Sequence, residues 1–190
     1  HNGMGELLSQ SSPDTGTTTF TYDEASNVKT RLDARGVLAT YAYDALNRLS
    51  RIAYPDETVT YTYDGCANGI GRLCGIADKT GNTSYAYDPH GRITQKSQSV
   101  DSLVQTMRYA YNGAGQLAAI TTPSGRLVEY GYVNNRPALL KVNGTLVLDS
   151  VLYEPFGPNG GWRWGNSSGA APNFHTRLFD RDFRATRVTS

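Results

Sequence analysis

The segment Tyr41-Ala42-Tyr43-Asp44-Ala45-Leu46-Asn47-Arg48-Leu49 recurs in modified form along the whole chain. Two tyrosines separated by one residue lie on the same face of a β-strand, because strand side chains alternate between faces. The Asp and Asn that follow are typical of a turn. Leu49 then begins a second segment, in which apolar and polar residues alternate less regularly. The segment therefore predicts a β-hairpin.

The second aromatic residue of this segment recurs at a nearly constant interval. Its seven positions are separated by 21, 20, 24, 24, 21 and 21 residues, and they are Tyr22, Tyr43, Tyr63, Tyr87, Tyr111, Tyr132 and Tyr153. The first aromatic residue stands two positions earlier in six copies, as Phe20, Tyr41, Tyr61, Tyr85, Tyr109 and Tyr130. Twelve of the 13 tyrosines share this register, and only Tyr54 lies outside it. A period near 20 residues indicates a repeat architecture.

Each repeat also contains a second turn, rich in Gly, Asn and Pro, such as Asp33-Ala34-Arg35-Gly36. One repeat is therefore strand, turn, strand, turn. We expect an all-β protein in which six or seven antiparallel hairpins of about 21 residues follow one another. Residues 1–18 form a polar segment, a loop or an imperfect first hairpin. Residues 19–153 hold the tandem repeats, and residues 154–190 a Trp- and Gly-rich segment that ends in an incomplete repeat.

Composition excludes several classes of function. A net charge of +1 argues against nucleic-acid binding, which usually needs a basic excess. The mean hydropathy is -0.47 and no apolar run approaches 18 residues, so we expect no membrane insertion. The three histidines, at 1, 90 and 175, have no partners at metal-binding spacing. We expect no metal site, no cofactor and no catalytic residue.

An acidic residue follows the aromatic pair in several repeats, as Asp23, Asp44, Asp64 and Asp88. A carboxylate there can accept backbone N–H bonds and stabilise the turn, or the acids together can form a metal or ligand array. Arg48 and Arg92 stand where they can pair with Asp44 and Asp88. Asn112 and Val133 replace the acid in other copies, which favours turn stabilisation, because an array would lose its ligands there.

Cys66 and Cys74 flank an insertion in the third repeat. If the insertion is a hairpin loop, the two cysteines can face each other and form a disulfide. Two free thiols and a redox role are the alternatives. A disulfide would indicate an oxidising compartment.

Trp162 and Trp164 are the best candidates for a binding site. Their spacing places both rings on one face of a strand, with Arg163 on the other. Such rings can stack on sugars or anchor a partner, or they can pack within the protein.

The aromatic-x-Tyr-Asp, turn, Arg-Leu pattern resembles the YD repeats of the bacterial RHS family. Tyr41 to Leu49 carries the resemblance most clearly and Tyr85 to Ile93 nearly as well, with further matches at Tyr153 to Gly157 and Trp162 to Asn166. The resemblance covers residues 17–187. It implies a continuous antiparallel sheet that spirals into part of a hollow β-shell. Related shells occur in secreted polymorphic toxins, insecticidal toxin complexes and teneurins.

The resemblance also implies a function and partners. We expect a non-enzymatic structural segment that encapsulates or presents a toxin domain, with further RHS repeats as partners and a secreted or cell-surface location. The alternative is a cell-surface module that binds cell-wall carbohydrate or mediates adhesion. Many RHS toxins carry an autoproteolytic Asp-Pro-x-Gly motif, but Asp88-Pro89-His90-Gly91 occupies the ordinary repeat turn. Because an open sheet leaves its end strands unpaired, we also expect edge-to-edge self-association.

Overall fold

The computed structural model describes residues 1–155, 157–165 and 173–189. The chain forms two compact units, His1–Gln105 and Thr106–Ser190. Seventeen strands occur in the described residues: β1 (Ser9–Ser12), β2 (Gly16–Tyr22), β3 (Val28–Leu32), β4 (Leu38–Tyr43), β5 (Leu49–Ala53), β6 (Thr58–Tyr63), β7 (Leu73–Asp78), β8 (Gly81–Tyr87), β9 (Ile93–Val100), β10 (Leu103–Tyr111), β11 (Leu117–Thr121), β12 (Leu127–Val133), β13 (Arg136–Val142), β14 (Thr145–Tyr153), β15 (Asn159–Trp164), β16 (Phe174–Phe179) and β17 (Ala185–Thr189).

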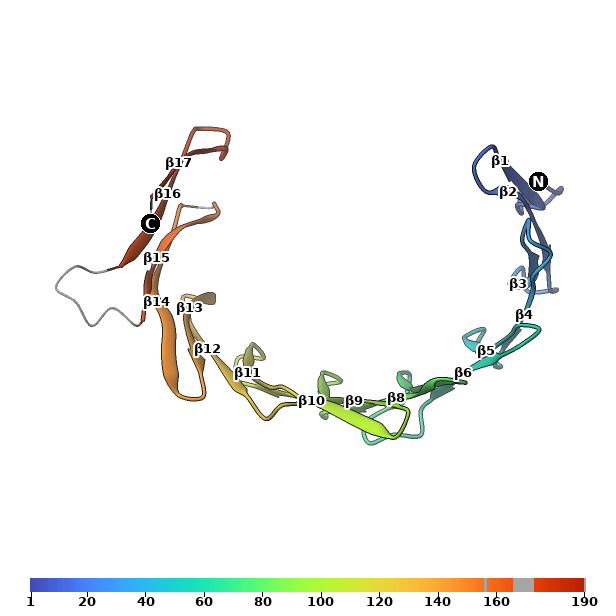
Figure 1. Cartoon of the computed structure of the whole chain (residues 1–190), viewed down its shortest axis with the longest axis horizontal. Helices are drawn as coiled ribbons and strands as arrows, with labels where there is room; N and C mark the ends of the chain where they lie inside the picture. The colour runs from blue at the N-terminus through green and yellow to red at the C-terminus, as the bar shows by residue number, and fades with distance from the viewer. Residues whose placement is uncertain (156, 166–172, 190) are drawn as a thin grey trace. The chain divides into compact units, whose positions relative to one another are not determined.

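The strands belong to one antiparallel sheet, and within each unit every strand pairs with its neighbours in the sequence (Figure 1). Even-numbered strands end at an aromatic pair or its equivalent, and we call them outgoing strands. Odd-numbered strands run back, and we call them return strands. In β4 and β5, for example, Tyr41 pairs with Ile52 and Tyr43 with Leu49. The expected all-β fold of tandem hairpins is confirmed.

A β-bulge recurs at the end of the outgoing strands. In β4 the register with β5 shifts between Ala42 and Tyr43. Equivalent shifts occur in the other hairpins of both units, next to Tyr22, Tyr63, Tyr87, Tyr111, Tyr132, Tyr153 and Phe179. A bulge bends the strand and re-aims the local side chain, and here it stands directly before the second aromatic residue, which still pairs with the return strand.

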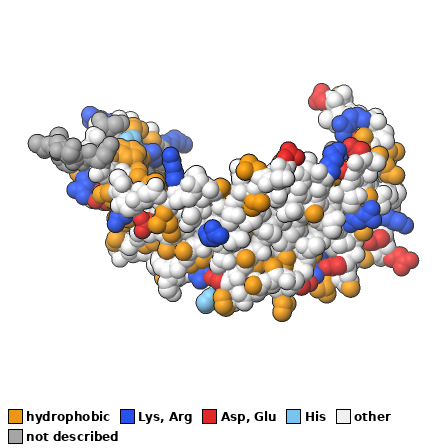
Figure 2. Space-filling model, turned by 60° about the horizontal axis from the view of Figure 1, so that its bottom comes forward, with side chains coloured by type: hydrophobic (Ala, Val, Ile, Leu, Met, Phe, Trp, Pro, Cys, Tyr) orange, Lys and Arg blue, Asp and Glu red, His pale blue; other side chains and the backbone are white. Residues whose placement is uncertain are grey.

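The sheet has almost no conventional core. Among the described residues, Ala39 is the one buried hydrophobic side chain, with 2% exposure. The accessible surface is 12550 Å², against about 8900 Å² for a compact protein of this mass. Figure 2 shows hydrophobic side chains scattered among polar ones on the visible face. A single layer without a second layer against it explains this exposure. No helix among the described residues is long and apolar enough to cross a membrane.

The two ends of the chain are more regular than the sequence indicates. Residues 1–18 contain β1 and the start of β2, which pair from Ser9–Thr19 to Ser12–Gly16. At the other end the sequence suggests a repeat that stops before its return strand. The structure instead forms that strand, β17, which pairs with β16 from Phe179–Ala185 to Thr176–Thr189.

Candidate functional site

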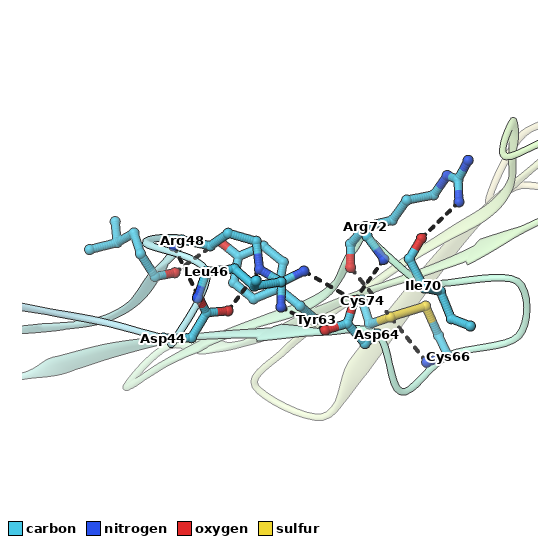
Figure 3. Close-up of polar contacts among 11 residues, drawn as sticks. Asp44, Leu46, Arg48, Tyr63, Asp64, Cys66, Ile70, Arg72 and Cys74 are labelled. Atoms are coloured by element: carbon cyan, nitrogen blue, oxygen red, sulfur yellow. Dashed lines mark hydrogen bonds and ion pairs between the residues drawn. A yellow bond between two sulfur atoms is a disulfide. The ribbon is translucent and has the colours of Figure 1, made fainter.

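The first turn of each repeat is organised by the residue after the second aromatic. The Asp44 Oδ1 atom accepts hydrogen bonds from the backbone N–H groups of Leu46 and Arg48, both at 2.9 Å. The Arg48 Nε donates to Asp44 Oδ2 at 2.7 Å (Figure 3). Asn47 adopts a left-handed φ of 57°, which Asn tolerates better than most residues. The sequence Asp-x-x-Asn-Arg is therefore matched to a four-residue turn.

The same pair of backbone hydrogen bonds recurs in other first turns. The acceptors are the side chains of Asp23, Asp44, Asp88, Asn112 and Asp180. Asn112 accepts from Ala114 and Gln116 without a negative charge. The acceptor geometry is thus needed more than the charge, as expected for a turn-stabilising residue. In the described residues, no group of three or more His, Cys, Asp or Glu side chains is placed to hold a metal ion.

The electrostatics of these acids follow from the turn. The backbone N–H of Arg48, followed by its guanidinium, holds the pKa of the Asp44 carboxyl below its usual value. The backbone N–H of Asn27 does the same for the pKa of Asp23. Burial alone would raise the pKa of Asp88, but the backbone and guanidinium of Arg92 lower it on balance. These carboxylates are ionised acceptors at neutral pH.

The second tyrosine of each pair connects neighbouring hairpins. Its hydroxyl donates a hydrogen bond to the backbone carbonyl at or near the start of the preceding return strand. The Tyr43 hydroxyl, for example, lies 2.9 Å from the Val28 carbonyl oxygen. The donor and acceptor pairs are Tyr22–Leu7, Tyr43–Val28, Tyr63–Leu49, Tyr87–Leu73, Tyr132–Leu117 and Tyr153–Pro137. The second tyrosine therefore links neighbouring repeats through a hydrogen bond, in addition to packing.

An arginine covers the tyrosine ring at several of these junctions. Arg48 lies 4.4 Å from the centre of the Tyr63 ring, and the same arginine binds both carboxylate oxygens of Asp64, at 3.0 and 2.6 Å. Arg72 lies over Tyr87 at 5.7 Å and Arg136 over Tyr153 at 5.0 Å. Each arginine directly precedes the residue whose carbonyl accepts the tyrosine hydroxyl. The junction therefore recognises a Tyr and, at Arg48, the Asp that follows it.

Asp64 has the most perturbed carboxyl group of the junctions. The guanidinium of Arg48, with help from the backbone N–H of Gly71, lowers the pKa of Asp64 to about 2. The carboxylates of Asp64 and Asp44 in turn raise the pKa of Arg48. Arg48 therefore joins two successive turns (Figure 3).

The first tyrosines of the pairs lie within the strands. They are half-buried and face residues of the neighbouring strand, as Tyr41–Ile52, Tyr61–Ile76, Tyr85–Lys96, Tyr109–Ile120 and Tyr130–Leu140. Tyr111 pairs with Leu117 at the bulge of its hairpin. The strand contacts of these residues are those of packing side chains.

The structure joins Cys66 and Cys74 by a disulfide that closes the insertion between β6 and β7. A Cβ atom at Gly69 would overlap both sulfur atoms, so the loop depends on glycine there. The side-chain amide of Asn68 donates to the Tyr87 carbonyl at 2.9 Å, so the closed loop reaches the next hairpin.

Trp162 and Trp164 lie on β15 with their rings edge to face, 5.5 Å between centres. Trp162 also stacks on His175 at 4.2 Å and lies 5.1 Å from Arg177. Arg163 bonds Asp149 at 2.7 Å through its Nε. Trp162 also lines an apolar hollow of about 280 Å³ with Tyr130, Leu139, Leu148 and Tyr153. Phe156 and Asn166, which belong to the runs that carry the resemblance here, lie outside the described residues.

Sequence reasoning missed one repeat turn, at the start of the chain. The Asn2 side-chain oxygen accepts hydrogen bonds from the backbone N–H groups of Met4 and Glu6, both at 3.0 Å. Gly5 has a left-handed φ of 82°, as Gly115 does in the later copy. The signal was present: Asn2-Gly3-Met4-Gly5-Glu6-Leu7 parallels Asn112-Gly113-Ala114-Gly115-Gln116-Leu117. The turn at Asn2 has no tyrosine before it, and tyrosine was the residue that defined the repeat register.

Comparison with known proteins finds solved structures with a similar fold. No protein-family model and no curated protein matches the sequence. Among solved structures, a TcdB2–TccC3–Cdc42 complex matches with a TM-score of 0.82 and 18% identity, over 97% of this chain and 11% of that one. A Photorhabdus luminescens Tc holotoxin pore with a mutated TccC3 matches with a TM-score of 0.83 and 16% identity, over 97% and 10%. TcdB2–TccC3 without its hypervariable C-terminal region gives 0.81 and 17%, over 96% and 10%.

These matches show the fold of the chain, which is RHS-like, as the tyrosine repeats indicate. The chain spans about a tenth of the length of the matched chains. It therefore corresponds in size to a segment of such a protein.

Proposed function

We propose that the chain is a non-enzymatic structural segment of an RHS-repeat shell that encapsulates or presents a toxin cargo. The observation that carries the proposal is the repeated junction, in which a tyrosine hydroxyl of one hairpin binds a backbone carbonyl of the preceding hairpin. Such junctions extend a sheet hairpin by hairpin and need no core between layers. The RHS-like fold, matched in structures of toxin complexes, supports the same function.

The use of the acidic residues supports a structural function. Asp88 is part of the one Asp-Pro-x-Gly sequence, and its Oδ1 atom accepts the backbone N–H groups of His90 and Arg92 at 2.9 and 3.0 Å. Its other oxygen lies 2.7 Å from the Arg92 Nε. Both oxygens thus hold the turn, as the carboxylate oxygens of Asp44 and Asp23 do in their own turns. We therefore assign Asp88 a structural role.

The disulfide supports a secreted or cell-surface location. Disulfides persist in oxidising compartments and are rare in the cytosol of most organisms. Cys66 and Cys74 close a loop that contacts the next hairpin through Asn68. An exported shell would gain from such a covalent closure, because it must remain folded outside the cell.

The experiment uses the complete translation product of the coding sequence that contains this chain. Limited proteolysis is followed by mass spectrometry, for the wild type and for a variant with Tyr43→Phe, Tyr63→Phe and Tyr132→Phe. Matched substitutions of the first tyrosines, Tyr41→Phe, Tyr61→Phe and Tyr130→Phe, are the control. We expect the wild type and control to shield a cargo segment that the triple junction variant exposes. A product whose every non-repeat segment is digested equally fast in all three proteins would overturn the proposal.

The alternative is a surface module that binds cell-wall carbohydrate. The apolar hollow favours it, because the rings of Tyr130, Tyr153 and Trp162 line one concave surface. Retention on peptidoglycan that is lost in a folded Trp162→Ala variant would support this alternative. The stacking of His175 on Trp162 favours packing instead, and then Trp162→Ala would lower the stability without any retention to lose.

A further inference from the structure

The loop between β6 and β7 is supported differently from the turn between β4 and β5. In the shorter turn, the Asp44 side chain accepts two backbone N–H groups and binds Arg48, with three residues between them. The loop places seven residues between Asp64 and Arg72. The Asp64 Oδ1 atom holds the far end of the loop, where it accepts the Gly71 N–H at 2.7 Å. The middle of the loop therefore needs another support.

The disulfide supplies this support from the centre of the loop (Figure 3). A Cβ atom at Gly69 would overlap the sulfur atoms of Cys66 and Cys74, so the glycine backbone lies directly against the disulfide. Gly69 is buried, and its N–H donates to the Cys66 carbonyl at 2.9 Å. The Arg72 N–H donates to the Gly69 carbonyl at 2.8 Å. The conformation of the loop thus depends on the bond between the two sulfur atoms.

The disulfide loop also holds the hairpin that follows it. The side-chain amide of Asn68, the residue before Gly69, donates to the Tyr87 carbonyl at 2.9 Å. The carbonyls of Asn68 and Ile70 accept hydrogen bonds from the Arg72 guanidinium, at 3.4 and 3.0 Å. That guanidinium lies over the Tyr87 ring. Two contacts with β8, through the Asn68 amide and through Arg72, therefore depend on the position of this loop.

The other end of the loop is connected to the hairpin that precedes it. Asp64, which accepts the Gly71 N–H, is bound through both carboxylate oxygens by Arg48 (Figure 3). Arg48 belongs to the turn between β4 and β5. The loop closed by the disulfide therefore connects three successive hairpins, all within the unit His1–Gln105.

The disulfide is accessible, and its surroundings favour one direction of cleavage. Cys66 and Cys74 are both half-buried, so a small thiol can approach them without unfolding of the chain. The Cys66 backbone N–H donates to the Cys74 sulfur at 3.0 Å. Because a hydrogen-bond donor stabilises a thiolate, the Cys74 sulfur is the better leaving group. The sulfur that an incoming thiolate attacks is then that of Cys66.

We propose that the Cys66–Cys74 disulfide is a site of thiol–disulfide exchange that opens the loop when the chain meets a dithiol reductant. A thiolate of the reductant bonds to the Cys66 sulfur, the S–S bond breaks, and Cys74 leaves as a thiolate that takes up a proton. The second thiolate of the reductant then attacks the reductant sulfur of the mixed disulfide and releases Cys66, which is protonated in turn. The reductant is oxidised to a disulfide, and the two cysteines gain its two electrons.

Reduction would uncouple the loop from its neighbours. Gly69 loses the disulfide against which it lies, and Asn68 is no longer held at the Tyr87 carbonyl. The turn at Asp44 is held by its own side chain and should not change. This inference rests on the proposed shell function, because a wall that is closed in an oxidising environment would loosen at this loop in a reducing compartment and there expose its cargo.

The test treats the complete translation product that contains this chain with increasing concentrations of dithiothreitol under native conditions. Alkylation and peptide mass spectrometry follow the two thiols, and hydrogen exchange follows the loop. We expect the reduction rate to rise in proportion to the reductant concentration. Exchange in residues 64–72 should become about 10-fold faster or more, with no change in residues 44–48. Rapid alkylation during reaction with glutathione should find the glutathione adduct on Cys66 and the alkyl group on Cys74.

Three variants separate release of the loop from a general loss of stability. Cys66→Ser with Cys74→Ser should exchange like the reduced wild type and should not respond to the reductant. Oxidised Asn68→Gly should raise exchange in residues 87–92 to the level of the reduced wild type. Glycine adopts the left-handed φ of 54° at Asn68 without strain, so this variant removes the amide alone. Asn47→Gly is the matched control, with a φ of 57° in the neighbouring turn, and should leave residues 87–92 unchanged.

Three results would overturn the inference. They are a reduction rate that does not depend on reductant concentration, a glutathione adduct on Cys74 in place of Cys66, and equal exchange in residues 64–72 before and after reduction. The cargo-shielding assay, repeated with reductant, separates this inference from the proposed function. Shielding that is the same after reduction contradicts the release and leaves the shell function intact. A loop that opens in a product that shields nothing supports the exchange site and contradicts the shell function.

Discussion

The Tyr63 hydroxyl donates a 2.8 Å hydrogen bond to the Leu49 carbonyl, one hairpin earlier in the chain. The bond is made by a side chain and so adds to the backbone ladder, in which Tyr63 pairs with Leu73 beside the bulge after Thr62. In a sheet with one buried hydrophobic side chain among its described residues, such bonds supply connections that a core would otherwise provide.

Removal of this hydroxyl should destabilise the chain. Tyr63→Phe keeps the ring under Arg48 but leaves the Leu49 carbonyl without its donor, and we expect a loss of about 1 kcal/mol in the free energy of unfolding. Urea unfolding followed by circular dichroism measures the change. Tyr61→Phe is the matched control in the same strand and should change the stability by less than about 0.5 kcal/mol. Equal losses for the two variants would contradict a special role of the second tyrosine.

The first turn should tolerate an amide and not a methyl group. Asp44→Asn keeps an oxygen that can accept the N–H groups of Leu46 and Arg48, as Asn112 does in its own turn. Asp44→Ala removes that acceptor, so we expect a larger fall in the thermal midpoint for Asp44→Ala than for Asp44→Asn. The turn account is wrong if the alanine variant is as stable as the asparagine variant.

The Arg48–Asp64 pair predicts a pH dependence of stability. The pKa of Asp64 is lowered from 3.8 to about 2, so its folded form holds the proton less tightly than its unfolded form. The pair therefore stabilises the folded state above about pH 4, and this contribution is lost as the pH falls toward 2. The difference in urea midpoint between wild type and Asp64→Asn should be constant from pH 5 to 7 and shrink toward zero near pH 2. A difference that persists unchanged at pH 2 would count against the pair.

The Cys66–Cys74 disulfide should stabilise the chain by about 2–3 kcal/mol, because it constrains a short loop in the unfolded state. The urea midpoints of the oxidised protein and of a Cys66→Ser, Cys74→Ser double variant measure this difference. Intact mass after alkylation without reductant should show no modified thiol. Two alkylated thiols in protein that has not been reduced would contradict the disulfide.

Much of the fold could be predicted from the tyrosine register. Tyr41 and Tyr43 on one strand face, the turn at Asp44 and the return at Leu49 follow from side-chain alternation and turn chemistry. The paired acids and arginines, such as Asp88 with Arg92, follow from their spacing on one turn. Local sequence determines these features, so local reasoning finds them.

The connections between repeats could not be predicted in the same way. The acceptor of the Tyr43 hydroxyl is the Val28 carbonyl, and a backbone carbonyl leaves no signature in the sequence. The bulge next to Tyr43 is likewise a property of strand pairing. Arg48 was placed with Asp44 from its spacing, but its second partner, Asp64, lies on the next hairpin. The repeat turn at Asn2 was missed because it lacks the tyrosine that marked the others.

A cryo-EM structure of the complete translation product that contains this chain tests the central claim most directly. We expect the tyrosine-to-carbonyl junctions, such as Tyr63 to Leu49, to be present in a wall that surrounds or carries a cargo. A product in which these junctions are absent or the hairpins enclose and carry nothing would contradict the account.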